Sequence, residues 1–179
     1  LPSGGRYYPK EVFTPTETGE IPILPMTAKD EMAFKTPDAM INGQSTVDVI
    51  KSCVPNLLDP WKMVNYDTDA VLLAIRIATY GETMDITFRV PGTEEDQQHS
   101  MNLPALLEDL GKLKIADSTT TSKGFKVDIQ PLDYKTLTKI QIARFEQQKM
   151  YGTIDSSSMT EEQKQTAFAK SFETLNMVN

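Results

Sequence analysis

The longest apolar stretch of the sequence predicts a central, buried helix. Residues 67–80 are mostly apolar, and between Ala70 and Ala78 only Arg76 is charged. A helix that is apolar almost all round is usually buried among other elements. We expect Asp67 to cap this helix and Gly81 to end it as the C′ residue.

Shorter helices are predicted on both sides of this stretch by their capping residues. Thr27–Asp30 has the spacing of a capping box, with Asp in place of Glu, and opens a helix that reaches about Phe34. Ser45 or Thr46 is expected to cap a second helix, which ends near Val54. Apolar spacing and capping residues predict further helices at 104–110, 134–151 and 160–178.

Alternating apolar and polar side chains predict short strands. Residues 84–90 alternate strictly, and residues 98–102 are the expected return strand of an antiparallel hairpin. Residues 125–129 alternate in the same way and predict another strand. The run of serine and threonine at 117–124, before this strand, is typical of an exposed polar loop.

The first 26 residues are rich in proline, glycine and tyrosine and predict an arm that contains a hairpin. In that hairpin residues 11–15 would pair with residues 20–24 across a turn at which Gly19 supplies a positive φ. Tyr7 and Tyr8 are candidate contact residues for a partner protein. The alternative is that one of the two packs on this chain's own core.

The last helix, residues 160–178, presents a narrow apolar face that must be buried against something. Phe168, Phe172 and Leu175 lie on this face and are candidate contact residues for another subunit. A helix pair within the chain is the simpler alternative. Residues 152–158 are expected to form a linker before this helix.

Together these elements predict an α+β fold, in which mainly short helices surround the central helix beside small antiparallel hairpins. We expect an N-terminal arm and hairpin over residues 1–26, a central α+β domain over residues 27–131 and a C-terminal helical arm over residues 132–179.

Charge excludes some classes of function. The 179 residues carry a net charge of −7, which argues against nucleic acid or an anionic membrane surface as the main ligand. No apolar run approaches the roughly 20 residues of a membrane span, and no signal peptide is visible. We therefore expect a protein of the cytoplasm, or of a particle assembled there.

No arrangement of reactive residues predicts catalysis. The single cysteine, Cys53, is expected to be a small buried apolar residue, and nothing brings the single histidine, His99, near it. The acidic run Glu94–Asp96 is typical of a solvated turn rather than a cation site. We therefore expect no enzyme, no cofactor, no metal and no small-molecule substrate.

The sequence resembles a known family most strongly between Lys35 and Glu82. The run KTPDAMINGQSTVDVIKSCVPNLLDPWKM, followed by DTDAVLLAIRIATYGE, is similar to the central signature of the baseplate hub proteins of T-even-type contractile-tailed bacteriophages. Weaker similarity lies at residues 1–9, 25–31, 136–148 and 159–163.

This resemblance implies a non-enzymatic structural protein of the phage tail baseplate hub, located in the virion tail and assembled in the host cytoplasm. Its partners would be other baseplate or tail proteins, with the tape-measure protein as one candidate. The alternative is a transient assembly chaperone for the hub or the tape-measure protein. Many relatives carry a Cys-x-x-Cys pair that resembles a zinc knuckle, but residues 89–102 here contain no cysteine.

Overall fold

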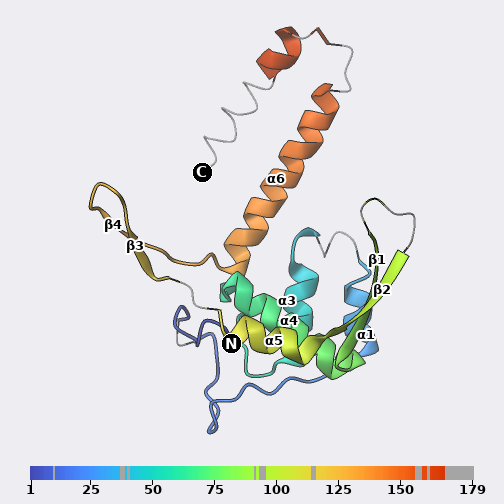
Figure 1. Cartoon of the computed structure of the whole chain (residues 1–179), viewed down its shortest axis with the longest axis vertical. Coiled ribbons are helices and arrows are strands. Elements are labelled where there is room, and N and C mark those ends of the chain that lie inside the picture. Colours follow the sequence, from blue (N-terminus) through green and yellow to red (C-terminus); the bar gives the residue numbers. More distant parts are fainter. Residues whose placement is uncertain are drawn as a thin grey trace. The chain divides into compact units, whose positions relative to one another are not determined.

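The computed structural model describes residues 1–9, 11–36, 39, 41–90, 92, 96–113, 116–155, 159–160 and 162–167. The chain forms two compact units, Leu1–Leu137 and Thr138–Asn179. The labelled elements of the described residues are α1 (Ala28–Ala33), α3 (Gln44–Cys53), the 3-10 helix η1 (Pro60–Lys62), α4 (Asn65–Tyr80), β1 (Thr83–Arg89), β2 (Asp96–Asn102), α5 (Leu103–Gly111), β3 (Ser118–Thr120), β4 (Lys126–Asp128) and α6 (Tyr134–Asp155) (Figure 1). The predicted α+β class is confirmed.

The hydrophobic core of the first unit lies between α3 and α4. It is closed by the N-terminal segment, which is the part of the chain before α1. α4 supplies Val71 and Ile75 to this core, whereas Ala78 and Tyr80 on the same helix are exposed. The central helix is therefore buried along one side rather than all round. The other buried members of the core are Val12, Val49, Ile50, Cys53, Val54, Leu57 and Met63.

The two ends of α4 differ in how well they were predicted. Gly81 ends the helix with a φ of 94°, as expected. The prediction that Asp67 caps the helix is wrong, because the N-cap is Val64 and the helix begins at Asn65. Asp67 lies inside the first turn and is fully buried, since its carboxylate faces the N-terminal segment.

The capping box of α1 forms as predicted. The Thr27 hydroxyl accepts a hydrogen bond from the Asp30 N–H, and the Asp30 carboxylate accepts one from the Thr27 N–H at 2.8 Å. Asp30 also accepts a bond from the Ser52 hydroxyl at 3.1 Å, which ties α1 to α3. Burial raises the pKa of Asp30, but the bonds from Thr27 and Ser52 outweigh it and hold that pKa below its ordinary value.

Asp30→Asn is expected to lower the free energy of unfolding by about 1 kcal/mol at neutral pH, the usual contribution of a helix cap. Because the folded pKa is depressed, this contribution is present above pH about 4 and is lost as the pH falls through the folded pKa. Urea denaturation at several pH values measures it. Asp85→Asn changes an exposed carboxylate on β1 and is the control. If Asp30→Asn lowers the free energy of unfolding by the same amount in acid as at neutral pH, the prediction is contradicted.

The start of α3 differs from the prediction. Gly43, with a φ of 76°, occupies the N-cap position expected for Ser45 or Thr46. Ser45 lies inside the helix, and its hydroxyl donates a hydrogen bond to the Ala33 carbonyl at 2.8 Å. The serine side chain therefore joins α3 to α1 instead of capping its own helix.

The predicted N-terminal hairpin is wrong, although its turn forms. Gly19 adopts a φ of 73° in that turn. Residues 11–15 and 20–24 do not pair with each other, because both bond to the last residue of α3 or to the segment just after it. The Thr14 N–H donates to the Asn56 carbonyl at 2.8 Å, and the Leu24 N–H donates to the Cys53 carbonyl at 2.7 Å.

The part of the chain that the structure describes contains two antiparallel hairpins. β1 and β2 pair with Thr83 opposite Asn102, which confirms the predicted hairpin with a longer return strand. β3 pairs with β4. The prediction of a loop throughout residues 117–124 is therefore wrong at Ser118–Thr120. The backbone of these residues pairs with β4, the strand that the alternating pattern predicted.

α6 begins where Tyr134 stacks on Trp61, with ring centroids 5.7 Å apart. The helix continues through Gly152 to Asp155, so the predicted linker is wrong for its first four residues, and residues 156–158 lie outside the described part. The predicted domain boundaries after residues 26 and 131 stay predictions. Within the described residues, no helix combines the length and apolar character needed to cross a membrane.

Candidate interaction surface

The N-terminal segment is anchored on the side chain of Asp67. The Ser3 N–H donates a hydrogen bond to Asp67 Oδ1 at 2.8 Å, and the Ser3 hydroxyl donates one to Oδ2. The Tyr8 hydroxyl also donates to Oδ2, at 2.6 Å, and accepts a bond from the Val64 N–H. This carboxylate therefore fixes residues 1–9 on the start of α4.

The two predicted contact tyrosines have different surroundings. Tyr8 is half-buried, and its ring meets Phe13 edge-on with centroids 5.1 Å apart, so it packs on this chain's own core. Burial and the bond to Asp67 raise the pKa of Tyr8 far above its ordinary value. Tyr7 is not among the described residues that pack on that core, and its hydroxyl donates to Asp117.

Asp117 stands at the base of the β3–β4 hairpin and joins it to the N-terminal segment. Its carboxylate pairs with the Arg6 guanidinium at 3.0 Å and accepts the bond from Tyr7. This bond from Tyr7 lowers the pKa of Asp117 and raises the pKa of Tyr7. Both partners of the Arg6–Asp117 pair are more than half exposed, so the pair contributes little to stability.

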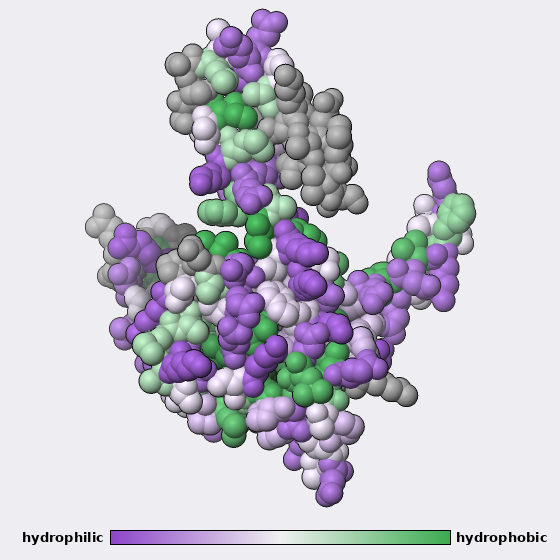
Figure 2. Space-filling model, turned by 180° about the vertical axis from the view of Figure 1, so that it is seen from behind, coloured by the Kyte–Doolittle hydropathy of each residue, from purple (hydrophilic) through white to green (hydrophobic). Residues whose placement is uncertain are grey.

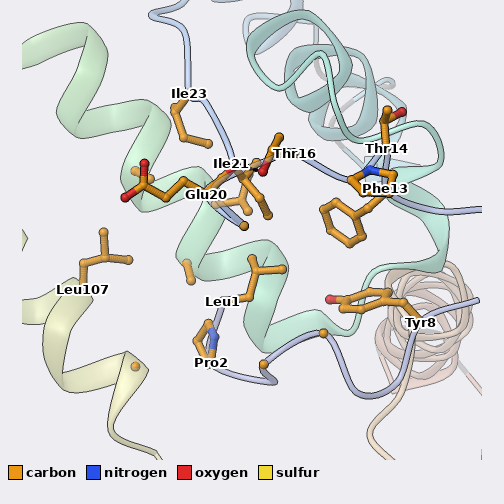
Figure 3. Close-up of a pocket in the computed structure, with 18 of the residues that line it drawn as sticks. Leu1, Pro2, Tyr8, Phe13, Thr14, Thr16, Glu20, Ile21, Ile23 and Leu107 are labelled. Atoms are coloured by element: carbon orange, nitrogen blue, oxygen red, sulfur yellow. Dashed lines mark hydrogen bonds between the residues drawn. The ribbon is translucent and has the colours of Figure 1, made fainter. Parts of the chain in front are cut away.

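An open, mainly apolar groove lies beside the N-terminal segment, with a volume of about 790 Å³ (Figure 3). Figure 3 shows Leu107 of α5 at one end and Tyr8 with Phe13 at the other, with Ile21 and Ile23 between them. The floor of the groove includes small residues, whose short or absent side chains leave this space open. They are Ala70 and Ala74 of α4 and Gly111 at the end of α5.

The β3–β4 hairpin exposes a second set of apolar side chains. Phe125 is 67% exposed, and Val127 and Ile129 on the same face are also exposed. Hydrophobic and hydrophilic residues lie side by side along this hairpin, at the right of Figure 2. A two-stranded hairpin without a core beneath it is marginally stable, so these residues are a surface that a neighbour can cover.

The described residues offer little for catalysis or metal binding. Cys53 is 1% exposed, and burial raises the pKa of its thiol, which keeps it protonated and unreactive at neutral pH. His99 lies exposed on β2, opposite Ile86. Within the described ranges, no three His, Cys, Asp or Glu side chains gather into a group that could hold a metal ion.

The predicted contact residues of the last helix, Phe168, Phe172 and Leu175, lie outside the described residues. The capping box that precedes them is present. The Thr160 N–H donates to the Gln163 side chain at 3.0 Å, and the Gln163 N–H donates back to the Thr160 hydroxyl at 3.4 Å. The predicted start of this helix is therefore confirmed.

The apolar groove and the exposed hairpin are both surfaces that another protein can cover. A family model described as "T4 bacteriophage base plate protein" matches residues 2–175. The chain belongs to this family. The searches of curated proteins and of solved structures gave no significant match.

Membership of the base plate family supplies the broad function. This base plate protein is a structural component of the phage tail, and its partners are other phage tail proteins. A structural baseplate family is typically non-enzymatic.

The base plate protein has two features that sequence reasoning missed. The groove combines residues of the N-terminal segment, α4 and α5, and no local pattern indicates which of them meet. The role of Asp67 as the anchor of residues 1–9 was missed because an aspartate before an apolar run is more often a cap. No local signal in the sequence could have found the anchor, because the residues that bond to Asp67, Ser3 and Tyr8, are 64 and 59 positions away.

Proposed function

We propose that this base plate protein is a non-enzymatic structural subunit of the baseplate hub in a contractile tail. The observation that carries the proposal is the open apolar groove beside the N-terminal segment, a surface suited to another protein. Family membership supports a place in the tail. The proposed partners are other baseplate or tail proteins, with the tape-measure protein as one candidate. The net charge of −7 supports the exclusion of nucleic acid and anionic membranes.

Quantitative proteomics of purified particles tests this proposal. A hub subunit is expected to yield peptides at a fixed, stoichiometric ratio to the other baseplate proteins. Absence from finished particles, with abundance in infected cells, would overturn the structural role and favour a transient assembly chaperone for the hub or the tape-measure protein.

We further propose that the contacts include Tyr7, Tyr8 and the apolar face of the last helix. Tyr8 lines the apolar groove, and Tyr7 lines a second, more polar groove beside Lys62 and Asp133, so both rings keep surface for a neighbour. The face of the last helix, proposed from the sequence, carries Phe168, Phe172 and Leu175.

Phe168→Ala combined with Phe172→Ala is expected to reduce incorporation into particles while residues 27–131 stay folded. Burial of each phenylalanine against another subunit contributes at most roughly 1.5–3 kcal/mol, so the double variant removes a large share of such a contact. Immunoblotting of purified particles measures incorporation, and thermal melting measures folding.

Lys170→Ala combined with Thr174→Ala is the matched control, because these residues lie on the opposite side of the same predicted helix. The control is expected to assemble normally. If the phenylalanine variant unfolds the rest of the chain, the helix belongs to this chain's own core and the arm proposal is wrong.

A further inference from the structure

The groove beside the N-terminal segment has the size and lining of a site for a peptide segment. Its volume of about 790 Å³ fits a few large side chains, and it is open to solvent rather than enclosed. Leu107, Ile21, Ile23 and Phe13 supply apolar surface along it (Figure 3). An open apolar groove of this kind is suited to the apolar side of an amphipathic segment.

The described side chains that line the groove carry a single charge, which is negative. Glu20 is the charged side chain among its described lining residues, and Figure 3 shows its carboxylate directed toward the end where Leu107 lies. Neither Glu20 nor nearby Glu17 takes part in an ion pair among the described residues. A carboxylate beside apolar surface that has no ion-pair partner among the described residues favours a partner that brings a lysine or arginine.

We propose that the groove binds an amphipathic segment of another tail protein, with apolar side chains along the floor and a lysine or arginine against Glu20. This rests on the proposed function in the tail. A second copy of this chain is a poorer occupant, because two chains of net charge −7 repel each other. The apolar floor supplies most of the affinity, and Glu20 sets the sign of charge that the groove accepts.

Photocross-linking during infection identifies the occupant. Leu107→p-benzoylphenylalanine places the reactive ring in the groove. Leu106→p-benzoylphenylalanine is the matched control. Leu106 lies on the same helix and is 39% exposed, but it is not among the groove's described lining residues. We expect position 107, but not position 106, to cross-link to a segment that has apolar residues at helical spacing and an adjacent lysine or arginine.

Three results would overturn the proposal. They are cross-links from position 107 to a second copy of this chain, cross-links to a segment without lysine or arginine, and equal or absent cross-linking at the two positions.

A synthetic peptide of the cross-linked segment then tests the role of charge on the full chain. Leu107→Lys is expected to weaken binding by about tenfold or more, and Glu20→Gln by about two- to fivefold, measured by fluorescence anisotropy. Glu17→Gln and Leu106→Lys should leave affinity unchanged. A peptide whose lysine or arginine is replaced by alanine should bind the unaltered protein and the Glu20→Gln variant equally well, and a persistent difference between the two proteins would contradict the proposed pairing.

The two proposals fail in different ways. A chain that is absent from finished particles but still cross-links through position 107 would overturn the structural role and keep the occupant of the groove. A stoichiometric particle component whose position 107 gives no cross-link would overturn the occupant and keep the structural role.

Discussion

Asp67→Ala is expected to lower the free energy of unfolding by about 3 kcal/mol or more, since hydrogen bonds to a carboxylate contribute about 1.5–3 kcal/mol each. The Ser3 N–H, the Ser3 hydroxyl and the Tyr8 hydroxyl all lose their acceptor in this variant. Asp67 is fully buried, so water replaces the carboxylate only if residues 1–9 leave their place. Chemical denaturation measures the loss of stability, and amide hydrogen exchange at Ser3 measures the release of the segment.

Controls separate this anchor from general damage to α4. Asp69→Ala changes an exposed residue on the same helix and should alter stability by less than about 0.5 kcal/mol. Tyr8→Phe removes one of the three bonds to Asp67, together with the bond from the Val64 N–H, and should cost about 1–2 kcal/mol. If Asp67→Ala leaves hydrogen exchange at Ser3 unchanged, the carboxylate does not hold the N-terminal segment.

Ile75→Asp is expected to abolish soluble, folded protein. Ile75 is 2% exposed in the core between α3 and α4, and the buried residues around it in this core are apolar apart from the thiol of Cys53. An unpaired carboxylate there costs several kcal/mol, a large part of the roughly 5–15 kcal/mol that stabilises a typical domain. Soluble yield and circular dichroism melting measure the effect.

Two substitutions on α4 show whether burial is the cause. Ile75→Val removes one methylene and should cost only about 0.5–1.5 kcal/mol. Ala78→Asp places the same carboxylate on the exposed side of the helix and should leave the protein folded. An Ile75→Asp protein with wild-type melting would show that α4 does not form the core.

Features fixed by neighbouring residues were predicted well. The Thr27–Asp30 capping box, the end of α4 at Gly81 and the β1–β2 hairpin each depend on contacts within a few residues or on one turn of chain. In these cases the backbone bonds that the sequence pattern implies are also the bonds that form.

Features that depend on distant partners were not predicted. Residues 11–24 have the turn of a hairpin, but their backbone bonds go to residues 53–58 because Val12 enters the core there. Ser118–Thr120 has the composition of a loop and becomes a strand because residues 126–128 lie opposite. Gly152 continues α6, since one glycine costs a helix only about 1 kcal/mol. The groove was missed because the residues that form its walls are far apart in the sequence.

The bond between Ser3 and Asp67 joins residues 64 positions apart, and this sets an order of events on the ribosome. At about 5–20 residues per second, the N-terminal segment waits several seconds before its acceptor is even synthesised. The groove is completed later still, when Leu107 and Gly111 have emerged. A short nascent chain therefore displays neither the anchored segment nor the finished groove. Any neighbour that recognises this groove can therefore engage only molecules in which all of its walls have been made and folded.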